Sequence, residues 1–303
     1  DNTAIGDNAL GANTTGANNV AVGSSTLLVN DASDNTGLGY AVLLANTTGE
    51  KNTAVGVNAL QANTTADNNT AVGRNALIAN TTGAQNVAVG ALALDANTTT
   101  SNCTAIGYNA LSASTIADNT AVGYNAGALI TTGTQNTAVG SEALDAATTV
   151  HDNTAIGYQA LTTCTIGGNT AVGSEAMEAT TTGAYGVAVG ASAMKLNTTG
   201  AENTAVGSTA LSTTTTGGYN TAVGSGSLKV NVAADNTAVG MASLKANTTG
   251  TKNTAVGGAA LALNTTASEN VGVGYQAGDA LTTGAANTYL GTYAGSAATP
   301  AAN

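Results

Sequence analysis

The feature that most constrains the fold of this sequence is a glycine that returns every sixteen or seventeen residues. It closes a short motif, usually Asn-Thr-Ala-Val-Gly, and it occurs 18 times. Of the 17 intervals between these marker glycines, 13 are seventeen residues long and four are sixteen. Two packed helices need roughly 30 residues or more, so the period is typical of a solenoid in which each repeat forms one coil. The marker glycines are Gly6, Gly23, Gly39, Gly56, Gly73, Gly90, Gly107, Gly123, Gly140, Gly157, Gly173, Gly190, Gly207, Gly224, Gly240, Gly257, Gly274 and Gly291.

The residues before each marker predict β-strands. The position three before it is Thr in 14 coils and Val in four, and the position directly before it is Val, Ile or Leu in all 18. β-branched residues at this density favour strands over helices. We therefore expect an all-β fold, a parallel β-solenoid (β-roll or β-helix) of about 18 coils of 16–17 residues. Residues 1–303 are predicted to form a single repeat domain, which is a segment of a longer fibre.

Stacking at about 4.8 Å places equivalent residues of successive coils directly above one another. The aliphatic residue before the marker is expected to form a continuous spine, so Val139 is predicted to lie in the core. An Asn stands four residues before the marker in 16 coils. Its amide is expected to donate to a carbonyl of the neighbouring coil, which satisfies a polar group that would otherwise be buried at a cost.

Four coils are one residue shorter than the others, and three of them share an acidic entry into the next strand. A short Asp side chain that closes its own turn onto the following backbone would save one residue. Calcium binding by these Asp residues is the alternative, but Lys51 and Lys252 stand in the same column of other coils and would break an ion ladder. The three entries are Ser33-Asp34, Ala117-Asp118 and Ala234-Asp235.

The cysteines and the glycosylation motifs have structural explanations. Cys103 stands in the Asn column and Cys164 in the Asn-Thr-Thr turn, more than three coils apart. That separation exceeds the reach of a disulfide, so both are predicted to be free thiols. Ten Asn-x-Thr sequons occur, and we expect their Asn side chains to serve the turn ladder because glycans on successive coils would collide.

Composition and charge argue against several functions. The net charge is −11 and the six Lys and Arg residues are scattered, so nucleic acid is not an expected partner. No stretch approaches the roughly 20 apolar residues of a membrane span. His151 is the only histidine, which leaves no His-based relay or metal cluster, and Glu175 and Glu178 are expected to form a solvated edge. We expect no enzyme activity, no catalytic, cofactor or metal site, and no cofactor.

The strand pattern predicts self-association. Alternate residues of a strand face opposite sides, so the Thr/Val columns and the Ala column lie on opposite faces. Neither face carries charge, and a strand that is apolar on both faces is usually buried on both. One face fills the coil, and the other is expected to be covered by further copies of the chain, in a parallel homotrimer or filament.

The motif also resembles known fibre repeats. The segment Asn119-Thr120-Ala121-Val122-Gly123-Tyr124-Asn125-Ala126-Gly127 is similar to shaft repeats of phage and virus tail fibres. The recurring Asn-Thr-Ala-Val/Ile-Gly-x-x-Ala-Leu also resembles the head repeats of trimeric autotransporter adhesins. The resemblance implies a trimer, an extracellular location on a cell surface or virion, and attachment to a host or surface receptor.

Two functions from different classes follow from the sequence. The first is a structural or adhesive fibre shaft, either a viral tail fibre or a bacterial surface adhesin segment that mediates attachment. The alternative is an ice-binding β-solenoid, because columns of Thr on a flat β-face can order water. Adjacent Thr residues of the Thr-Thr turn point in opposite directions, so only one of those two columns could face ice.

Overall fold

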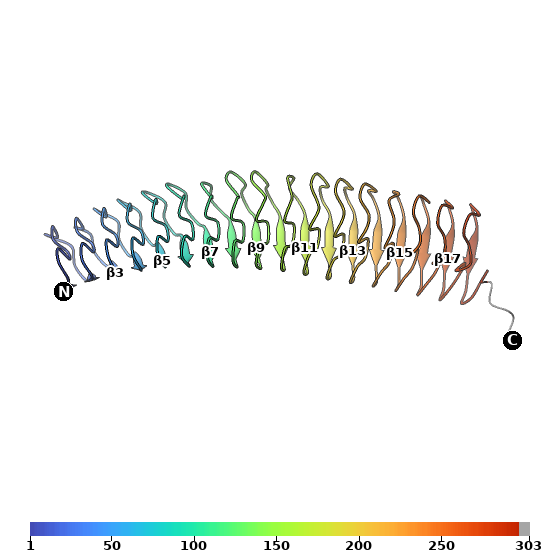
Figure 1. The fold of residues 1–303 in the computed structure, drawn as a ribbon, viewed down its shortest axis with the longest axis horizontal. Coiled ribbons are helices and arrows are strands. Elements are labelled where there is room, and N and C mark those ends of the chain that lie inside the picture. The colour runs from blue at the N-terminus through green and yellow to red at the C-terminus, as the bar shows by residue number, and fades with distance from the viewer. Residues whose placement is uncertain (297–303) are drawn as a thin grey trace. The chain divides into compact units, whose positions relative to one another are not determined.

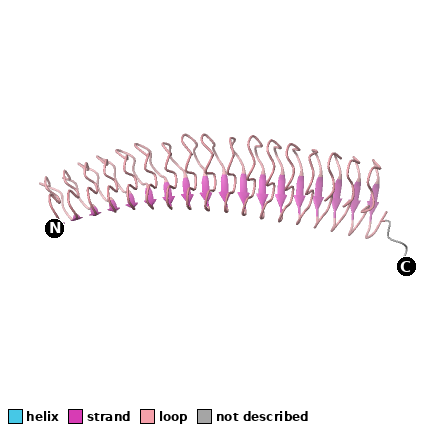
Figure 2. Cartoon of the chain, in the orientation of Figure 1, coloured by secondary structure: helices cyan, strands magenta, loops and turns pink. Residues whose placement is uncertain are grey.

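The computed structural model describes residues 1–296 as short strands joined by turns, with no helix among them. There are 18 strands of three residues each, one for every predicted coil, and turns and loops make up the rest of each coil (Figure 2). The predicted all-β parallel solenoid is confirmed. Contacts divide the chain into two compact units, Asp1–Asp152 and Asn153–Asn303.

The first unit is a parallel solenoid of nine strands. Successive strands lie side by side (Figure 1). Each pairs in register with the strand of the next coil, so that Thr53 lies beside Thr70 and Ala54 beside Ala71. The strands are β1 (Thr3–Ile5), β2 (Val20–Val22), β3 (Thr36–Leu38), β4 (Thr53–Val55), β5 (Thr70–Val72), β6 (Val87–Val89), β7 (Thr104–Ile106), β8 (Thr120–Val122) and β9 (Thr137–Val139).

The second unit has the same construction, also with nine strands. Thr237 pairs with Thr254, and Ala238 with Ala255, in the same parallel register. The strands are β10 (Thr154–Ile156), β11 (Thr170–Val172), β12 (Val187–Val189), β13 (Thr204–Val206), β14 (Thr221–Val223), β15 (Thr237–Val239), β16 (Thr254–Val256), β17 (Val271–Val273) and β18 (Thr288–Leu290).

The interior of the coils is lined by the central residue of the strands, which is Ala in 15 of 18 and is buried in every strand except β1 and β18. The predicted valine spine is therefore wrong. Ala138 is 1% exposed, whereas Val139 and Thr137 are only half-buried and point outward. The core is completed by the Ala-Leu pair that follows each marker, such as Ala59 and Leu60, both fully buried.

Space explains why alanine faces inward. At Gly37, a Cβ atom would lie 2.6 Å from Cγ2 of Thr26, a residue that replaces the usual alanine of the Ala-Leu pair. At Gly272, a Cβ atom would lie 2.8 Å from Cγ of Leu261. Large side chains from the turn already fill the coil, so only a small residue fits at the centre of the strand.

The Asn column before each strand forms a buried ladder. The amide of Asn69 donates from Nδ2 to the Gly83 carbonyl of the next coil at 2.9 Å, as predicted. In addition, its Oδ1 accepts the backbone N–H of Asn86 at 2.9 Å. Each Asn therefore satisfies two backbone groups that the three-residue strands leave unpaired, which is the requirement for burying them.

A second ladder runs through the Asn of the Asn-Thr-Thr turn. Asn63 donates from Nδ2 to Oδ1 of Asn46 in the preceding coil at 2.8 Å and to the Ala66 carbonyl at 3.1 Å. Asn80 repeats the contact on Asn63 at 3.1 Å. These side chains are fully buried, which places the sequon Asn residues of these turns in the ladder, away from solvent.

The marker glycines form a corner where successive backbones nearly touch. Gly73 has a φ of +142°, and a Cβ atom there would lie 2.5 Å from the backbone of Gly90 in the next coil. Both the backbone conformation and the contact exclude a side chain. The contact repeats from coil to coil, which is why this residue marks every repeat.

The turn after the marker bends through left-handed residues that are not glycine. In one coil Asn58 has φ 59° and Leu60 has φ 50°. The left-handed conformation costs a leucine about 1–2 kcal/mol, but complete burial of the side chain contributes about 1.5–3 kcal/mol. The strained turn is therefore stabilised by the leucine that it directs into the core.

The four short coils lose their residue in the turn after the second ladder. In a long coil, Asn46 donates to the carbonyl of Gly49, three residues further on. In a short coil, Asn30 donates to the carbonyl of Ala32, only two residues further on, at 2.9 Å. The ladder contact is kept while the turn becomes one residue shorter.

The Asp that precedes the strand does not shorten these coils, so that prediction is wrong. Asp34 has φ 63° and Lys51, at the same position of a long coil, has φ 57°. The backbone is thus left-handed there whatever the coil length. The Asp34 carboxylate accepts a hydrogen bond from Asn18 Nδ2 of the preceding coil at 3.1 Å, a contact between coils.

Candidate functional face

The outward face of the strands is open to a partner in both units. Within each unit it consists of the Thr or Val that begins each strand and the Val, Ile or Leu that ends it. No strand contains a charged residue. The aliphatic side chains remain well exposed, with Val189 and Val256 both at 38%. Monomers rarely expose a contiguous apolar patch that repeats in this way.

Tyrosines border this face directly after some marker glycines. The rings of Tyr108 and Tyr124 stack with centroids 5.7 Å apart and an interplanar angle of 12°. They are 47% and 51% exposed, so about half of each side chain is open to solvent. The stacked pair extends the apolar surface beyond the strands in the first unit. The sequence places both residues in one column, which is a signal that the prediction did not use.

The first Thr of the Thr-Thr turn is used to tie coils together. Thr64 donates from Oγ1 to the Thr81 carbonyl of the next coil at 3.1 Å, and Thr81 does the same to Thr98 at 2.9 Å. Hydroxyls engaged along the stack are not free to order water on a face. The Thr residues that begin the strands, such as Thr137, point outward instead.

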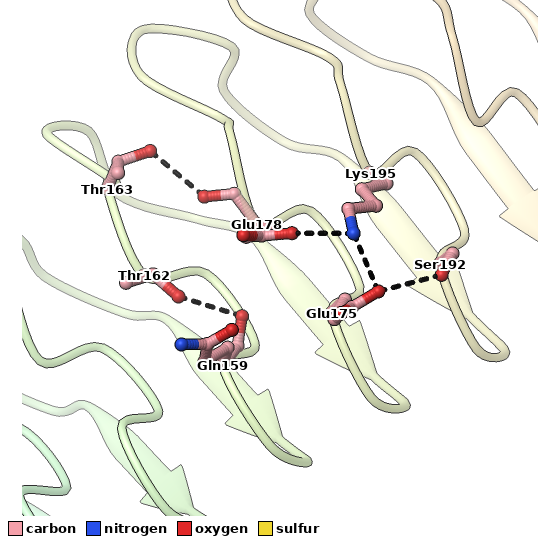
Figure 3. A network of polar contacts seen from close by, with 7 residues as sticks. All are labelled: Gln159, Thr162, Thr163, Glu175, Glu178, Ser192 and Lys195. Atoms are coloured by element: carbon pink, nitrogen blue, oxygen red, sulfur yellow. Dashed lines mark hydrogen bonds and ion pairs between the residues drawn. The ribbon is translucent and has the colours of Figure 1, made fainter.

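An ion-pair network joins Glu175 and Glu178 to Lys195, which lies one coil further on (Figure 3). Lys195 Nζ lies 2.7 Å from Glu175 Oε2 and 3.2 Å from Glu178 Oε2, and Ser192 donates to Glu175 at 3.2 Å. The Lys195 hydrogen bond, followed by that of Ser192, lowers the pKa of Glu175. The expected solvated edge is therefore a paired cluster, whose side chains remain about one-third exposed, so solvent screens the ion pairs.

The same network includes backbone ties. Thr163 donates from Oγ1 to the Glu178 carbonyl at 3.0 Å, and Thr162 donates to the Gln159 carbonyl at 2.8 Å, as drawn in Figure 3. The Thr163 contact holds the turn that carries Glu178, and the Thr162 contact closes the turn of the preceding coil. The cluster therefore joins neighbouring coils, and this structural role accounts for it.

His151 is exposed on a turn of the first unit. Its Nδ1 lies 3.1 Å from the backbone nitrogen of Thr134, which donates to it, and 3.0 Å from the Thr134 hydroxyl. Within residues 1–296, no group of three His, Cys, Asp or Glu side chains is arranged to hold a metal ion. His151 thus takes part in an ordinary contact between coils.

Two half-buried carboxylates, Asp95 and Asp145, lie on turns of the first unit. Burial raises the pKa of Asp95. Burial, and secondarily the charge of Glu142, raises the pKa of Asp145.

Both cysteines are free, as predicted, and the structure shows that both are buried. Cys103 replaces Asn in the first ladder, where its thiol lies 3.4 Å from the Ile116 carbonyl. Cys164 replaces Asn in the second ladder, where its thiol contacts the Ile166 carbonyl at 2.9 Å. Burial raises the pKa of both thiols, which keeps them protonated and slow to react.

Comparisons with known proteins give no assignment. No family model matches the chain, and no curated protein matches it. No helix that could span a bilayer occurs among the described residues.

Proposed function

We propose that this chain is a structural and adhesive fibre segment whose copies associate side by side through the outward Thr/Val face. The observation that carries the proposal is the exposure of that face. It is free of charge along every strand, yet aliphatic side chains such as Val206 remain 37% exposed. Burying such a stripe against a second copy contributes about 25 cal/mol for each Å² removed from water.

A second copy of the chain matches this face in spacing and chemistry. Coils repeat at the strand spacing of about 4.8 Å in every copy, so parallel copies can align coil for coil. The charges that give the chain its net −11 lie outside the strands and do not oppose contact between strand faces. Closed symmetry is usual for homo-oligomers, and we favour a parallel homotrimer about a common axis.

The fibre is proposed to be extracellular, on a virion or a cell surface, and to mediate attachment to a host or surface receptor. Support comes from the resemblance of the repeat to tail-fibre shafts and trimeric adhesin heads. A solenoid of repeated coils supplies an extended scaffold in which each coil contacts its neighbours. In this proposal the chain is not an enzyme, and its binding capacity belongs to a repeated surface.

Paired charge substitutions test the interface. Val122→Asp with Val139→Asp places two carboxylates on the outward face of adjacent strands, where association would desolvate them at high cost. The matched control, Thr132→Asp with Thr149→Asp, adds the same charge on exposed turns of the same unit. Sedimentation should show assembly of the wild type and the control but not of the face variant, with unchanged circular dichroism. Equal masses for all three proteins would contradict the proposal.

The second candidate is ice binding, and the outward Thr column favours it. Thr residues such as Thr221 and Thr237 lie side by side on adjacent strands and face outward. Thermal hysteresis of the purified chain separates the candidates. A fibre segment should show none, and a clear hysteresis that Thr221→Leu reduces would favour ice binding.

A further inference from the structure

A groove of about 580 Å³ opens on the second unit, lined by residues of the turns that follow the marker glycines. Its volume lies within the range of about 300–1,000 Å³ that is usual for small-molecule sites. It spans three successive coils, whose marker glycines are Gly224, Gly240 and Gly257. The residues that line it include Lys229, Val230, Lys245, Ala246, Ala262 and Leu263.

The groove lies where Ala246 stands between two larger neighbours of its column. Val230, Ala246 and Leu263 occupy the same position in three successive coils. Val230 and Leu263 project into solvent, with 36% and 56% of their surface exposed. The methyl group of Ala246 between them leaves a hollow with aliphatic walls.

Two lysines stand beside this hollow without an acidic partner. Lys229 and Lys245 hold the same position in adjacent coils, so their backbones lie about 4.8 Å apart. Like charges directly opposite one another on adjacent coils are destabilising. Among residues 1–296 no carboxylate lies within ion-pair distance of either ammonium group, and the next acid in the column, Asp279, is two coils beyond Lys245.

Lys195 provides the internal comparison, because it occupies the same column in an earlier coil. Its ammonium group is held by Glu175 and Glu178. Carboxylates of the chain itself therefore neutralise Lys195. Lys229 and Lys245 have no such carboxylate among the described residues, so an anion bound from solution would have to neutralise them. A single anionic group placed between the two ammonium groups would relieve their repulsion.

We infer that this groove binds a single-chain anionic amphiphile, with its phosphate, sulfate or carboxylate group between Lys229 and Lys245 and its alkyl chain over Ala246. The charge complementarity selects the head group, and the aliphatic walls select the chain. A groove three coils long is too short for a stable protein partner, which typically buries about 1,200 Å² or more in total. The site requires only one copy of the chain, so it is independent of the proposed fibre interface.

Calorimetric titration with octyl phosphate below its micelle concentration tests the site on the full chain. Inorganic phosphate and 1-octanol each carry half of the ligand chemistry, and each should bind at least about tenfold more weakly. The Lys229→Gln, Lys245→Gln double variant should lose about tenfold in affinity for octyl phosphate. Lys252→Gln, which removes a cation elsewhere in the unit, should change the affinity little.

Ala246→Leu tests the hollow without changing the charge. Leu196 stands in the same column of another coil, so the fold accommodates a leucine there, and circular dichroism should be unchanged. The leucine side chain should fill the groove and weaken octyl phosphate binding by about tenfold. Absence of octyl phosphate binding to the wild type would overturn the inference. So would equal affinity for inorganic phosphate, a loss in Lys252→Gln as large as in the double variant, or full affinity in Ala246→Leu.

Discussion

Thr214 lies one coil beyond Asn197 in the second ladder, but its buried hydroxyl reaches no hydrogen-bond partner. Asn197, by contrast, donates from Nδ2 to the Gly200 carbonyl at 2.9 Å. The threonine side chain is too short to make the ladder contacts. Thr180, at the same position of another coil, is also buried without a partner.

Thr214→Asn is therefore expected to stabilise the chain. The longer amide can donate to Asn197 Oδ1 and to the Gly217 carbonyl, and it removes a buried unsatisfied hydroxyl. Each such hydrogen bond contributes about 0.5–1.5 kcal/mol. Urea denaturation should show a higher midpoint, whereas Thr216→Asn on the exposed turn should leave it unchanged. A lower midpoint for Thr214→Asn would contradict the proposed ladder geometry.

The inward position of alanine gives a second prediction. Ala138→Leu should destabilise the chain by about 1–3 kcal/mol or more, because the filled interior must shift to admit a larger side chain. Val139→Leu enlarges the neighbouring side chain, which points out of the coil onto the face proposed to join copies, and should cost less than Ala138→Leu. Both changes are uncharged, so denaturation reports packing within the coil. A larger loss of unfolding free energy in Val139→Leu than in Ala138→Leu would contradict this account. It would indicate that the valine column, and not the alanine column, faces the core.

Glycine is required at the marker but not at every position with positive φ. Gly73→Ala should cost about 3 kcal/mol or more, because its Cβ would collide with the backbone of Gly90 in a strained conformation. Gly226 has φ +65° and no atom within 4 Å of a built Cβ. Gly226→Asn should be neutral or stabilising by up to about 1 kcal/mol. Thermal unfolding of the two variants checks this contrast.

Acid should weaken one contact in the first unit. The Asp31 carboxylate accepts hydrogen bonds from the backbone of Thr15 at 2.6 Å and of Thr14 at 2.8 Å. These bonds, and then the Thr14 hydroxyl, hold its pKa well below the ordinary 3.8. A lowered pKa stabilises the folded chain fully above the ordinary value, and the contribution is lost as pH falls below it.

Asp31→Asn should therefore be less stable than the wild type at about pH 6, and the difference should shrink at about pH 3. Urea denaturation at both pH values measures it. Asp7→Asn changes the net charge equally at another exposed acid and serves as the control. A gap between wild type and Asp31→Asn that is as wide in acid as at neutral pH would exclude this role for the carboxylate.

The register of the coils was predictable because the marker glycine recurs without interruption. Aligning these glycines places Thr53 beside Thr70, as observed, and aligns the Asn ladder that Asn69 and Asn86 form. The inward residue was not predictable from hydrophobicity, since valine is more apolar than alanine. It depends on Leu60 and its equivalents, which enter the core through left-handed turns that leucine rarely adopts.

Some surface features could be predicted from the sequence, and others required the structure. Tyr108 and Tyr124 each follow a marker glycine, so their stacking could have been expected from the columns. Lys229 and Lys245 are aligned in the same way. The hollow beside them depends on how far Val230 and Leu263 project, which requires the packed structure. The partner of Lys195 likewise depends on the path of the turn that carries Glu178.

The mass of the unmodified chain in solution tests the central claim most directly. One chain has a mass of 28.9 kDa. If the outward Thr/Val face joins copies side by side, light scattering at micromolar concentration should give a multiple of that mass, and three times that mass for the parallel homotrimer. A stable, soluble species of 28.9 kDa at the same concentration would contradict the account, because the apolar face would then remain open to water.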